Sequence, residues 1–334
     1  MLLSICIPTY NRVLHLDNCL NSIFLAKKRK NLKFEVCVSD NGSSQNTGKI
    51  INKYKKKLNI KFHKFKKNKG FALNLLKAIR MASGEYVWML GNDDLLNPNA
   101  FKEINKVLNK KKKFDFVYIN SSYLNKEYLD TFKHPFDTKN LPKKMKKISN
   151  EKKSRELNFW QLVDPKVSWD FMLGIFLLMF NRKMFLNNLD ILNLKNMSDK
   201  RPWSNSDNTF WYLKVCARSF KNSKAFFCAK PLSINLYGVR EWHNLYYLIE
   251  IVRMPEVLDY FREEGMGFLR YVYCKNFALR NYFNYMLKII LMKKKGGLEY
   301  VSFFKHFLLN LVFPNLYLSI VYYFLRKFKR SISI

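Results

Sequence analysis

Two adjacent aspartates, Asp93 and Asp94, are the side chains of this sequence whose type and spacing most directly suggest chemistry. They follow an apolar run over residues 85–90, rich in Val, Trp, Tyr and Leu, that is typical of a central strand. Neighbouring carboxylates repel each other unless a cation lies beside them, and Mg²⁺ or Mn²⁺ takes carboxylate oxygens together with substrate phosphates. The pair therefore predicts a divalent metal site. It equally predicts a cap for the next helix, which has Pro98 near its first turn.

The elements that position the aspartates alternate between strand and helix over residues 1–120. This alternation predicts an α/β fold with a doubly wound, mostly parallel sheet and helices on both of its faces. Asn11 is the expected N-cap of the first helix, and Ser43 or Ser44 is the expected N-cap of the second. The expected strands cover residues 2–7, 34–39, 60–62, 85–90 and 114–119.

Three of these strands end in small or polar residues, at positions 8–11, 39–43 and 91–94. In a parallel sheet the carboxyl ends of the strands lie along one edge, so we expect the three segments to converge on a single crevice. The sequence has neither a GxGxxG motif nor a Walker A loop, which excludes the phosphate cradles of the dinucleotide-binding and P-loop folds.

Four motifs carry a resemblance to a known family. They are ICIPTYNR at residues 5–12, EVCVSDNGS at 35–43, NKG at 68–70 and GEYVWMLGNDD at 84–94. Their order and spacing resemble a family 2 glycosyltransferase with the GT-A fold. The ending LGNDD is similar to the abequosyltransferase-like O-antigen branch. The resemblance covers residues 1–120 closely and residues 165–225 weakly.

The resemblance implies that the loop after the first strand and the acidic residue after the second hold a nucleotide-sugar donor. Asp40 would accept a hydrogen bond from the base, although Asp-Asn-Gly is also an ordinary turn sequence. Asn68 and Gly70 would lie beside the nucleotide-sugar, and they too fit an ordinary turn. The residues implied in donor binding are Pro8, Thr9, Tyr10, Asn11, Arg12, Asp40, Asn68, Gly70 and Asp93.

Asp93 and Asp94 match the metal site of this family, with Asn92 where an acidic residue often stands. The resemblance implies Mg²⁺ or Mn²⁺ as the cofactor, with Asp94 as a direct ligand and Asp93 as a sugar or ribose contact that also serves the metal. The cation would neutralise the diphosphate and stabilise it as a leaving group.

An inverting sugar transfer also needs a base that deprotonates the acceptor hydroxyl. The family supplies a carboxylate from a Glu-Asp pair that opens a helix, and the best match here is Ser206-Asp207. Asp207 is therefore the expected catalytic base. The same residue fits a helix N-cap, and Asp170 is a rival candidate for the base.

The charge of the chain points to an anionic partner. The formal net charge is +35 over 334 residues, of which 48% are hydrophobic. Nucleic acid, an acidic membrane and phosphorylated ligands all fit this charge, as does a plain compositional bias towards Lys. Residues 265–334 contain twelve Lys or Arg and a single acidic residue, Glu299, and residues 307–325 carry no charge.

For this C-terminal segment we expect two amphipathic helices in the membrane interface, with residues 293–295 and 326–330 meeting anionic headgroups. A single spanning helix and a helical bundle packed on the catalytic domain are the alternatives. The expected domains are residues 1–120 as the nucleotide-sugar half, residues 121–250 as the acceptor half with a Lys-rich insertion, and residues 251–334 as the helical, membrane-associated segment.

Together these observations predict a non-processive hexosyl- or deoxyhexosyltransferase that acts on a glycan acceptor, lipid-linked, with no nucleic acid as partner. The six cysteines form no CxxC pair and the N-terminus shows no signal peptide, so we expect a cytoplasmic protein, peripheral at the inner face of the cytoplasmic membrane. A basic membrane- or nucleic-acid-binding protein on a degenerate GT-A fold is one alternative. A nucleotidyltransferase is another, although residues 8–11 are not the Gly-rich loop that it requires.

Overall fold

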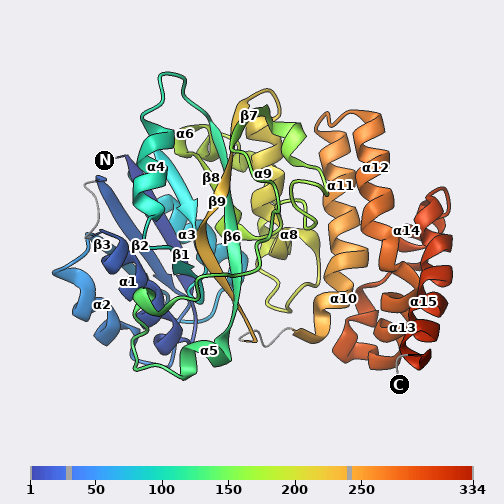
Figure 1. Ribbon diagram of the computed structural model, residues 1–334, viewed down its shortest axis with the longest axis horizontal. Helices are drawn as coiled ribbons and strands as arrows, with labels where there is room; N and C mark the ends of the chain where they lie inside the picture. Colours follow the sequence, from blue (N-terminus) through green and yellow to red (C-terminus); the bar gives the residue numbers. More distant parts are fainter. Residues whose placement is uncertain (1, 28–31, 239–242, 333–334) are drawn as a thin grey trace.

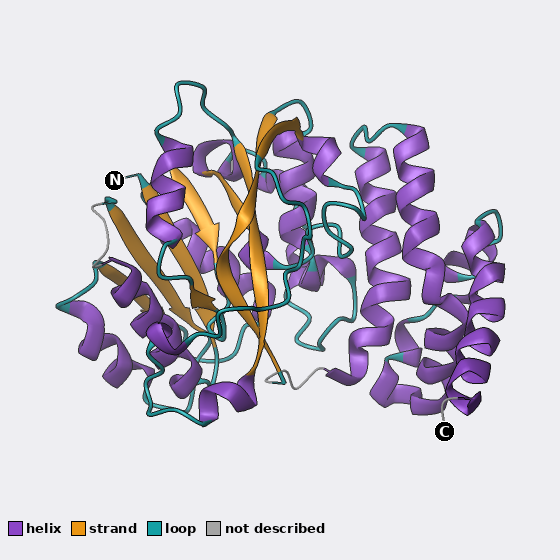
Figure 2. Cartoon of the chain, viewed as in Figure 1, coloured by secondary structure: helices purple, strands orange, loops and turns teal. Residues whose placement is uncertain are grey.

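The computed structural model describes residues 2–27, 32–238 and 243–332, without the side chains of residue 327 and residues 329–332. A nine-stranded sheet forms its centre (Figures 1 and 2). The strands are β1 (Leu3–Thr9), β2 (Phe34–Asp40), β3 (Ile60–Lys64), β4 (Tyr86–Met89), β5 (Leu95–Leu96), β6 (Phe116–Asn125), β7 (Arg155–Asn158), β8 (Leu178–Asn181) and β9 (Lys224–Tyr237). Their order across the sheet is β3-β2-β1-β4-β8-β6-β9-β5, and β7 pairs with β9.

The sheet is mostly parallel, as expected from the sequence. Strands β1, β2, β3, β4, β6 and β9 run in one direction, and β5, β7 and β8 run in the other. Every residue of β1 and β2 is buried, because helices cover both faces of this part of the sheet.

Most helices lie on the two faces of the sheet or in a separate bundle at one end of the molecule (Figure 1). One face carries α1 (Val13–Lys27), α2 (Thr47–Lys55) and α4 (Ala100–Leu108); the other carries α3 (Phe71–Met81), α6 (Arg182–Leu186), α8 (Ser206–Thr209) and α9 (Trp211–Phe220). Two short helices, α5 (Lys126–Asp130) and α7 (Leu194–Met197), lie in connections. The bundle contains α10 (Tyr246–Leu248), α11 (Met254–Glu263), α12 (Phe268–Ala278), α13 (Tyr282–Met292), α14 (Phe303–His306) and α15 (Pro314–Ile332).

The predicted N-caps of the first two helices are wrong. Asn11 has a left-handed backbone, with φ of 49°, and its Oδ1 accepts from the Ser44 backbone N–H at 2.9 Å instead of capping α1. Helix α2 is capped by Asn46, whose side chain accepts from the backbone N–H of Lys49. Asn11 and the serines are instead bonded to each other across the ends of β1 and β2.

The helical C-terminal segment predicted from the sequence is confirmed, and it packs on the sheet domain. The rings of Trp160 and Phe261 lie 5.6 Å apart, and the Cys274 thiol donates to the carbonyl of Val163. Within the described residues, no single helix is long and apolar enough to cross a membrane. The helical segments Phe303–Asn310 and Pro314–Arg326 are long and apolar enough only when taken together, and they are bent by 92° relative to each other. The predicted headgroup contacts of residues 327, 329 and 330 lie outside the described side chains.

Candidate functional site

The carboxyl ends of three parallel strands meet at one edge of the sheet, as the sequence predicts. Thr9, the last residue of β1, is in register with Asp40, the last residue of β2. The Thr9 carbonyl accepts from the Asn41 backbone N–H at 2.9 Å. On the other side of β1, the Thr9 hydroxyl accepts from Asn92 Nδ2 at 2.8 Å. Thr9 therefore ties the loop after β2 to the loop after β4, which carries the two aspartates.

Asp40 is fully buried at this edge, and half of its carboxylate is unsatisfied. Its Oδ1 accepts from the backbone N–H of Ser43 at 2.9 Å and from the Ser43 hydroxyl at 2.5 Å. Its Oδ2 is buried without a hydrogen-bond partner among the described residues, and Lys64 Nζ lies 3.9 Å away. A buried carboxylate oxygen without a donor is costly, so the geometry suits a ligand that brings an N–H or O–H to Asp40.

Asn68 and Gly70 join the same edge through Asn41. Asn41 Nδ2 donates to Asn68 Oδ1 at 2.8 Å, and that oxygen also accepts from the Gly70 backbone N–H at 2.8 Å. Gly70, with φ of 89°, precedes α3, whose first turn has no side-chain cap. Asn74, in the same helix, donates to the Thr9 carbonyl at 3.2 Å, while its Oδ1 is buried and unpartnered within the part of the chain described. An uncapped helix N-terminus favours an anion such as a phosphate.

The two aspartates after β4 differ in exposure. Asp94 is 1% exposed; its Oδ2 accepts from the Gly91 N–H and its Oδ1 from Asn235 Nδ2 of β9, each at 2.8 Å. The Asp93 side chain is 13% exposed, and its Oδ2 lies 3.4 Å from Arg12 Nη1. The N-cap of helix α4 is Asn99, and β5 lies between that residue and the two aspartates. Neither aspartate therefore caps α4, and the alternative prediction of a helix cap is wrong.

The residues at this edge fit a divalent cation that the substrate helps to hold. The described residues contain no cluster of three His, Cys, Asp or Glu side chains that would bind a metal unaided. Mg²⁺ is commonly bound by one or two carboxylates together with substrate phosphates and water. Asp93 and Asp94 match that donor set.

The predicted base, Asp207, lies in a second polar cluster that meets the first at Gly70. Its Oδ1 is 2.6 Å from Lys214 Nζ, and its Oδ2 accepts from Asn196 Nδ2 at 2.9 Å. A Cβ at Gly70 would lie 3.7 Å from the carbonyl oxygens of Met197 and Asp199. Residues 197–199 therefore lie next to Gly70, where the two clusters meet. The N-cap of α8 is Asn205, and the alternative role of Asp207 as the N-cap is therefore wrong.

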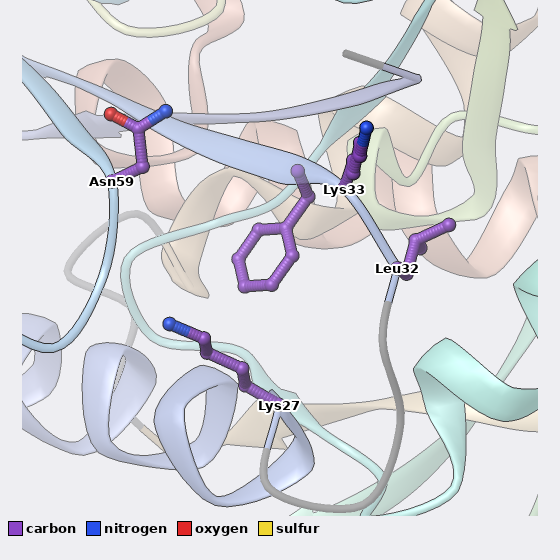
Figure 3. A pocket seen from close by; sticks show the side chains of 5 residues that line it. Lys27, Leu32, Lys33 and Asn59 are labelled. Carbon is purple, nitrogen blue, oxygen red and sulfur yellow. The ribbon is translucent and has the colours of Figure 1, made fainter.

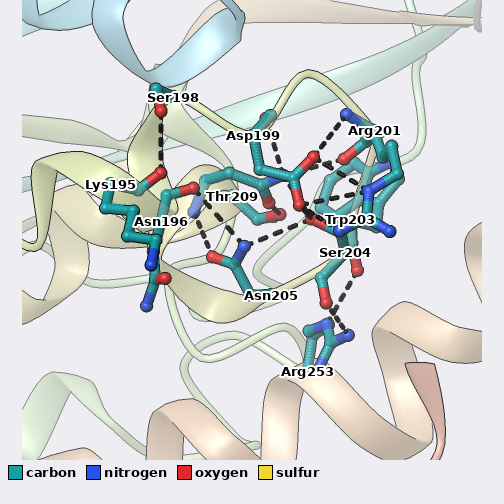
Figure 4. A network of polar contacts seen from close by, with 11 residues as sticks. Lys195, Asn196, Ser198, Asp199, Arg201, Trp203, Ser204, Asn205, Thr209 and Arg253 are labelled. Carbon is teal, nitrogen blue, oxygen red and sulfur yellow. Dashed lines mark hydrogen bonds and ion pairs between the residues drawn. The ribbon is translucent and has the colours of Figure 1, made fainter.

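The loop that precedes Asp207 is held by a dense set of hydrogen bonds (Figure 4). Asn208 Nδ2 donates to the carbonyls of Asp199 and Arg201. Arg253, 3% exposed, donates from Nε to the Trp203 carbonyl at 2.9 Å and from Nη2 to the Ser204 carbonyl at 2.7 Å. Sequence reasoning missed Arg253 because it lies in a different part of the chain, in a π-helical turn that leads into α11.

Two other carboxylates near this loop are poor candidates for a base. The hydrogen bond from the Arg201 side chain holds the pKa of Asp199 well below its usual range, so its carboxylate attracts protons weakly. Asp170 is buried, and its carboxylate accepts from the Ser168 hydroxyl and from the Gly174 N–H. Burial raises the pKa of Asp170, and Asp170 is buried whereas Asp207 is half-buried, so an acceptor sugar reaches it less readily.

A hollow elsewhere on the molecule is separate from these clusters (Figure 3). It is lined by Lys27, Leu32, Lys33, Phe34 and Asn59, which lie where β2 and β3 begin. Because both strands run away from this point, the hollow lies at the opposite edge of the sheet from Asp40.

Comparisons with known proteins agree with this geometry. Residues 4–164 match the model of Glycosyl transferase family 2. An abequosyltransferase of Salmonella typhimurium is 41% identical over 98 residues, which is 29% of this chain and 29% of that protein. The match thus spans well under two-thirds of this relative.

Two solved structures share the architecture. The poly(ribitol-phosphate) beta-N-acetylglucosaminyltransferase TarS of Staphylococcus aureus, in complex with UDP-GlcNAc, has a TM-score of 0.60 and 17% identity, covering 89% of this chain and 78% of that one. A mannosyltransferase of Pyrobaculum calidifontis in complex with GDP-Man and Mn²⁺ has a TM-score of 0.52 and 12% identity, covering 95% and 83%. These likenesses confirm the GT-A fold.

Proposed function

Since residues 4–164 belong to Glycosyl transferase family 2, we propose that the chain transfers a sugar from a nucleotide-diphosphate-sugar donor to a glycan acceptor. The observation that carries this proposal is the shared edge of β1, β2 and β4. There the buried, unpartnered Oδ2 of Asp40 and the partly exposed carboxylate of Asp93, both within the described residues, are joined through Thr9 and Asn92.

We assign the base of the donor to Asp40 and its diphosphate to the N-terminus of α3. Asp40 accepts a hydrogen bond from the base, which gives a donor to a buried oxygen that has no hydrogen bond among the described residues and lies 3.9 Å from Lys64 Nζ. Tyr10, 42% exposed, provides an apolar ring at the rim next to Asn11 and Arg12. The N-terminus of α3, opened by Gly70, faces the negative charge of the diphosphate. UDP-GlcNAc and GDP-Man bind structural neighbours of the same fold, which supports a nucleotide-sugar as the ligand.

Mg²⁺ or Mn²⁺ is the proposed cofactor, held by Asp93 and Asp94 together with the diphosphate. When bound, the cation supplies Lewis-acid stabilisation of the leaving group. The Gly91 N–H and Asn235 fix the orientation of Asp94, and Arg12 lies beside Asp93 with a positive charge that also suits phosphate oxygens. The Mn²⁺ in the complex of the Pyrobaculum mannosyltransferase supports this choice.

Asp207 is the proposed base for an inverting transfer. Its carboxylate would take the proton of the acceptor hydroxyl as that oxygen attacks the anomeric carbon. Asn196 and Lys214 hold both of its oxygens, which fixes the orientation of the side chain. The acceptor is expected to be a surface glycan, lipid-linked, and the enzyme to be peripheral at the inner face of the cytoplasmic membrane; the abequosyltransferase relative supports a deoxyhexosyl donor of the O-antigen type.

A ligand screen tests the proposal and does not require that the sugar be identified first. A ligand that binds only the native state raises its melting temperature. We expect at least one nucleotide-sugar to stabilise the protein in the presence of Mn²⁺ and to do so less in EDTA. If nucleoside diphosphates and their sugars all leave the melting temperature unchanged, while the protein is folded, the proposed function is wrong.

A further inference from the structure

Helices α14 and α15 lie at the end of the molecule farthest from β3 (Figure 1). This end carries many exposed apolar side chains. It is built from α14, a 3₁₀ turn at Leu308–Asn310 and α15. Six of these side chains, which we call the outer apolar surface, are Phe303, Phe304, Leu309, Val312, Val321 and Phe324. Their exposed fractions run from 51% for Val321 to 78% for Val312. A soluble protein rarely leaves so many large apolar groups in water unless they meet a partner.

Helix α15 uses only a narrow stripe to pack on the bundle. Leu316 and Ser319 are buried, and the Ser319 hydroxyl accepts from the backbone N–H of Phe283 at 3.0 Å. The neighbouring positions Leu318, Val321 and Phe324 are exposed. Most of the circumference of α15 is therefore apolar and uncovered, a pattern that fits a helix whose other sides meet an apolar medium.

The charge around this surface identifies the partner. Residues 300–334 contain five Lys or Arg, at 305, 326, 327, 329 and 330, and no Asp or Glu. Four of the five follow directly after the apolar part of α15. Apolar side chains next to a cluster of cations match the acyl chains and anionic headgroups of a lipid leaflet. A second copy of the chain is a poorer match, because a two-fold interface would bring the same cations together without any acidic residue between them.

The bend between the two helical parts suits insertion into one leaflet. Phe303–Asn310 and Pro314–Arg326 meet at 92°. An α-helix rises about 1.5 Å per residue, so the longer arm is roughly 20 Å long, less than the ~30 Å hydrocarbon core of a bilayer. Buried Asn310, whose Nδ2 donates to the His306 carbonyl at 2.9 Å, fixes the geometry next to the bend.

We propose that the outer apolar surface inserts into one leaflet of a bilayer that contains anionic lipid, which the run of Lys and Arg over residues 326–330 of the sequence favours. The two arms dip into the acyl region without crossing it. Lys305 and His306, on α14, pair with Glu256 of the bundle at 3.1 Å and 3.0 Å, so the inserted helix stays attached to the rest of the molecule. The surface is distinct from the proposed donor site, and its test uses no sugar donor.

Vesicle binding of the full chain tests the inference. The probes are vesicles of phosphatidylcholine alone and of phosphatidylcholine with roughly 30% phosphatidylglycerol. We expect the wild-type chain to sediment with the anionic vesicles at least roughly tenfold more strongly than with neutral ones, and added salt to weaken the binding. A double variant, Phe303→Asp with Val312→Asp, should lose at least roughly tenfold in partition onto the anionic vesicles.

A matched control separates insertion from general charge effects. Leu14 and Leu194 are 63% and 58% exposed on the sheet domain, so Leu14→Asp with Leu194→Asp makes the same change of charge at a similarly exposed apolar pair. The control variant should bind anionic vesicles as the wild type does. Equal losses of vesicle binding in the two variants would contradict the insertion of this surface. The absence of vesicle binding by the wild-type chain would also contradict it. If the wild type is a dimer in solution and the Phe303/Val312 variant is a monomer, a second copy of the chain occupies the surface instead of lipid.

Discussion

Asn92 donates from Nδ2 to the hydroxyl of Thr9 at 2.8 Å, and both side chains are more than nine-tenths buried. This bond joins the end of β1 to the loop that carries Asp93 and Asp94. Because Thr9 is also in register with Asp40, the bond fixes the separation between the carboxylate that we propose binds the base and the pair that we propose binds the metal. The site depends on this rigid spacing, since a nucleoside diphosphate must reach both groups at once.

The space at Gly91 is expected to matter more for function than for stability. A Cβ at this position would lie 2.7 Å from both Asp93 Oδ1 and Asp94 Oδ2. Both atoms end side chains, so they can move and the fold should survive. We expect Gly91→Ala to keep its melting temperature within about 3 °C of the wild type while Mn²⁺-dependent donor binding weakens by roughly tenfold or more.

Gly84→Ala is the matched control for that variant. Its Cβ would lie 2.8 Å from the backbone N of Ser4 and 2.9 Å from the carbonyl carbon of Leu3, which cannot move aside as a side chain does. Gly84→Ala should therefore lower the melting temperature clearly. Unchanged donor binding in folded Gly91→Ala would show that the aspartates do not contact the donor.

Asp207→Asn should abolish transfer while donor binding persists. Asn keeps the shape of the side chain but cannot accept a proton, and loss of a general base typically costs about 10²–10⁴ in rate. The readouts are kcat for transfer and the melting-temperature shift caused by the donor. Asp199→Asn is the comparison, because Asp199 is engaged by Arg201 and Ser204 and should affect kcat less. Near-normal transfer by Asp207→Asn would assign the base to another residue.

Arg253 should be essential for the stability of the loop that precedes Asp207. Arg253→Ala would leave the carbonyls of Trp203 and Ser204 without their donor and Glu256 without its closest guanidinium. Breaking a buried pair of this kind costs about 3–5 kcal/mol, which urea unfolding can measure. Arg201→Ala, which removes a side chain that is 67% exposed, should lower the stability far less. Equal effects of the two variants would contradict a special role for Arg253.

The same cluster should make stability depend on acid pH. Burial alone would raise the pKa of Glu256, but the hydrogen bond from His306 and the charges of Arg253 and Lys305 lower it to about 2. A carboxylate whose folded pKa is depressed stabilises the protein fully above its unfolded pKa, near 4.5, and loses that contribution as the pH falls towards 2. The contribution is on the order of 3 kcal/mol. Urea unfolding at pH 6, 4 and 3 should therefore show a steeper loss for the wild type than for Glu256→Gln, and parallel curves would exclude Glu256 as the cause.

Local patterns are enough to predict β1 to β4 and β6 and the edge at which the polar strand ends meet, but they do not predict β5, β7, β8 or β9. The strands and their polar ends lie close together in sequence, and the parallel direction of β1, β2 and β4 brings Thr9, Asp40 and Asp93 to the same edge. Asn41 lies within the motif at residues 35–43, although its bond to Asn68 is not evident from the sequence.

Contacts between distant segments could not be predicted. Asn235 comes from β9, 141 residues after Asp94, and nothing in its local sequence marks it as a partner of that carboxylate. Arg253 likewise reaches a loop 49 and 50 residues earlier in the chain. The helix caps predicted at Asn11 and at Ser43 or Ser44 are wrong for a related reason. The Ser43 hydroxyl accepts from the Asn11 backbone N–H and donates to Asp40, and the Asn11 side chain accepts from the Ser44 N–H, which a propensity for capping does not reveal.

Donor binding by paired variants tests the central claim most directly. With the nucleotide-sugar found by the ligand screen, calorimetric titration in Mn²⁺ compares the wild type with Asp40→Asn and Asp93→Asn, which alter residues that follow different strands. Because one ligand spans both carboxylates, each variant should bind at least roughly tenfold more weakly while remaining folded, and EDTA should weaken the wild type to a similar extent. Wild-type affinity in both folded variants would contradict a single donor site at this edge of the sheet.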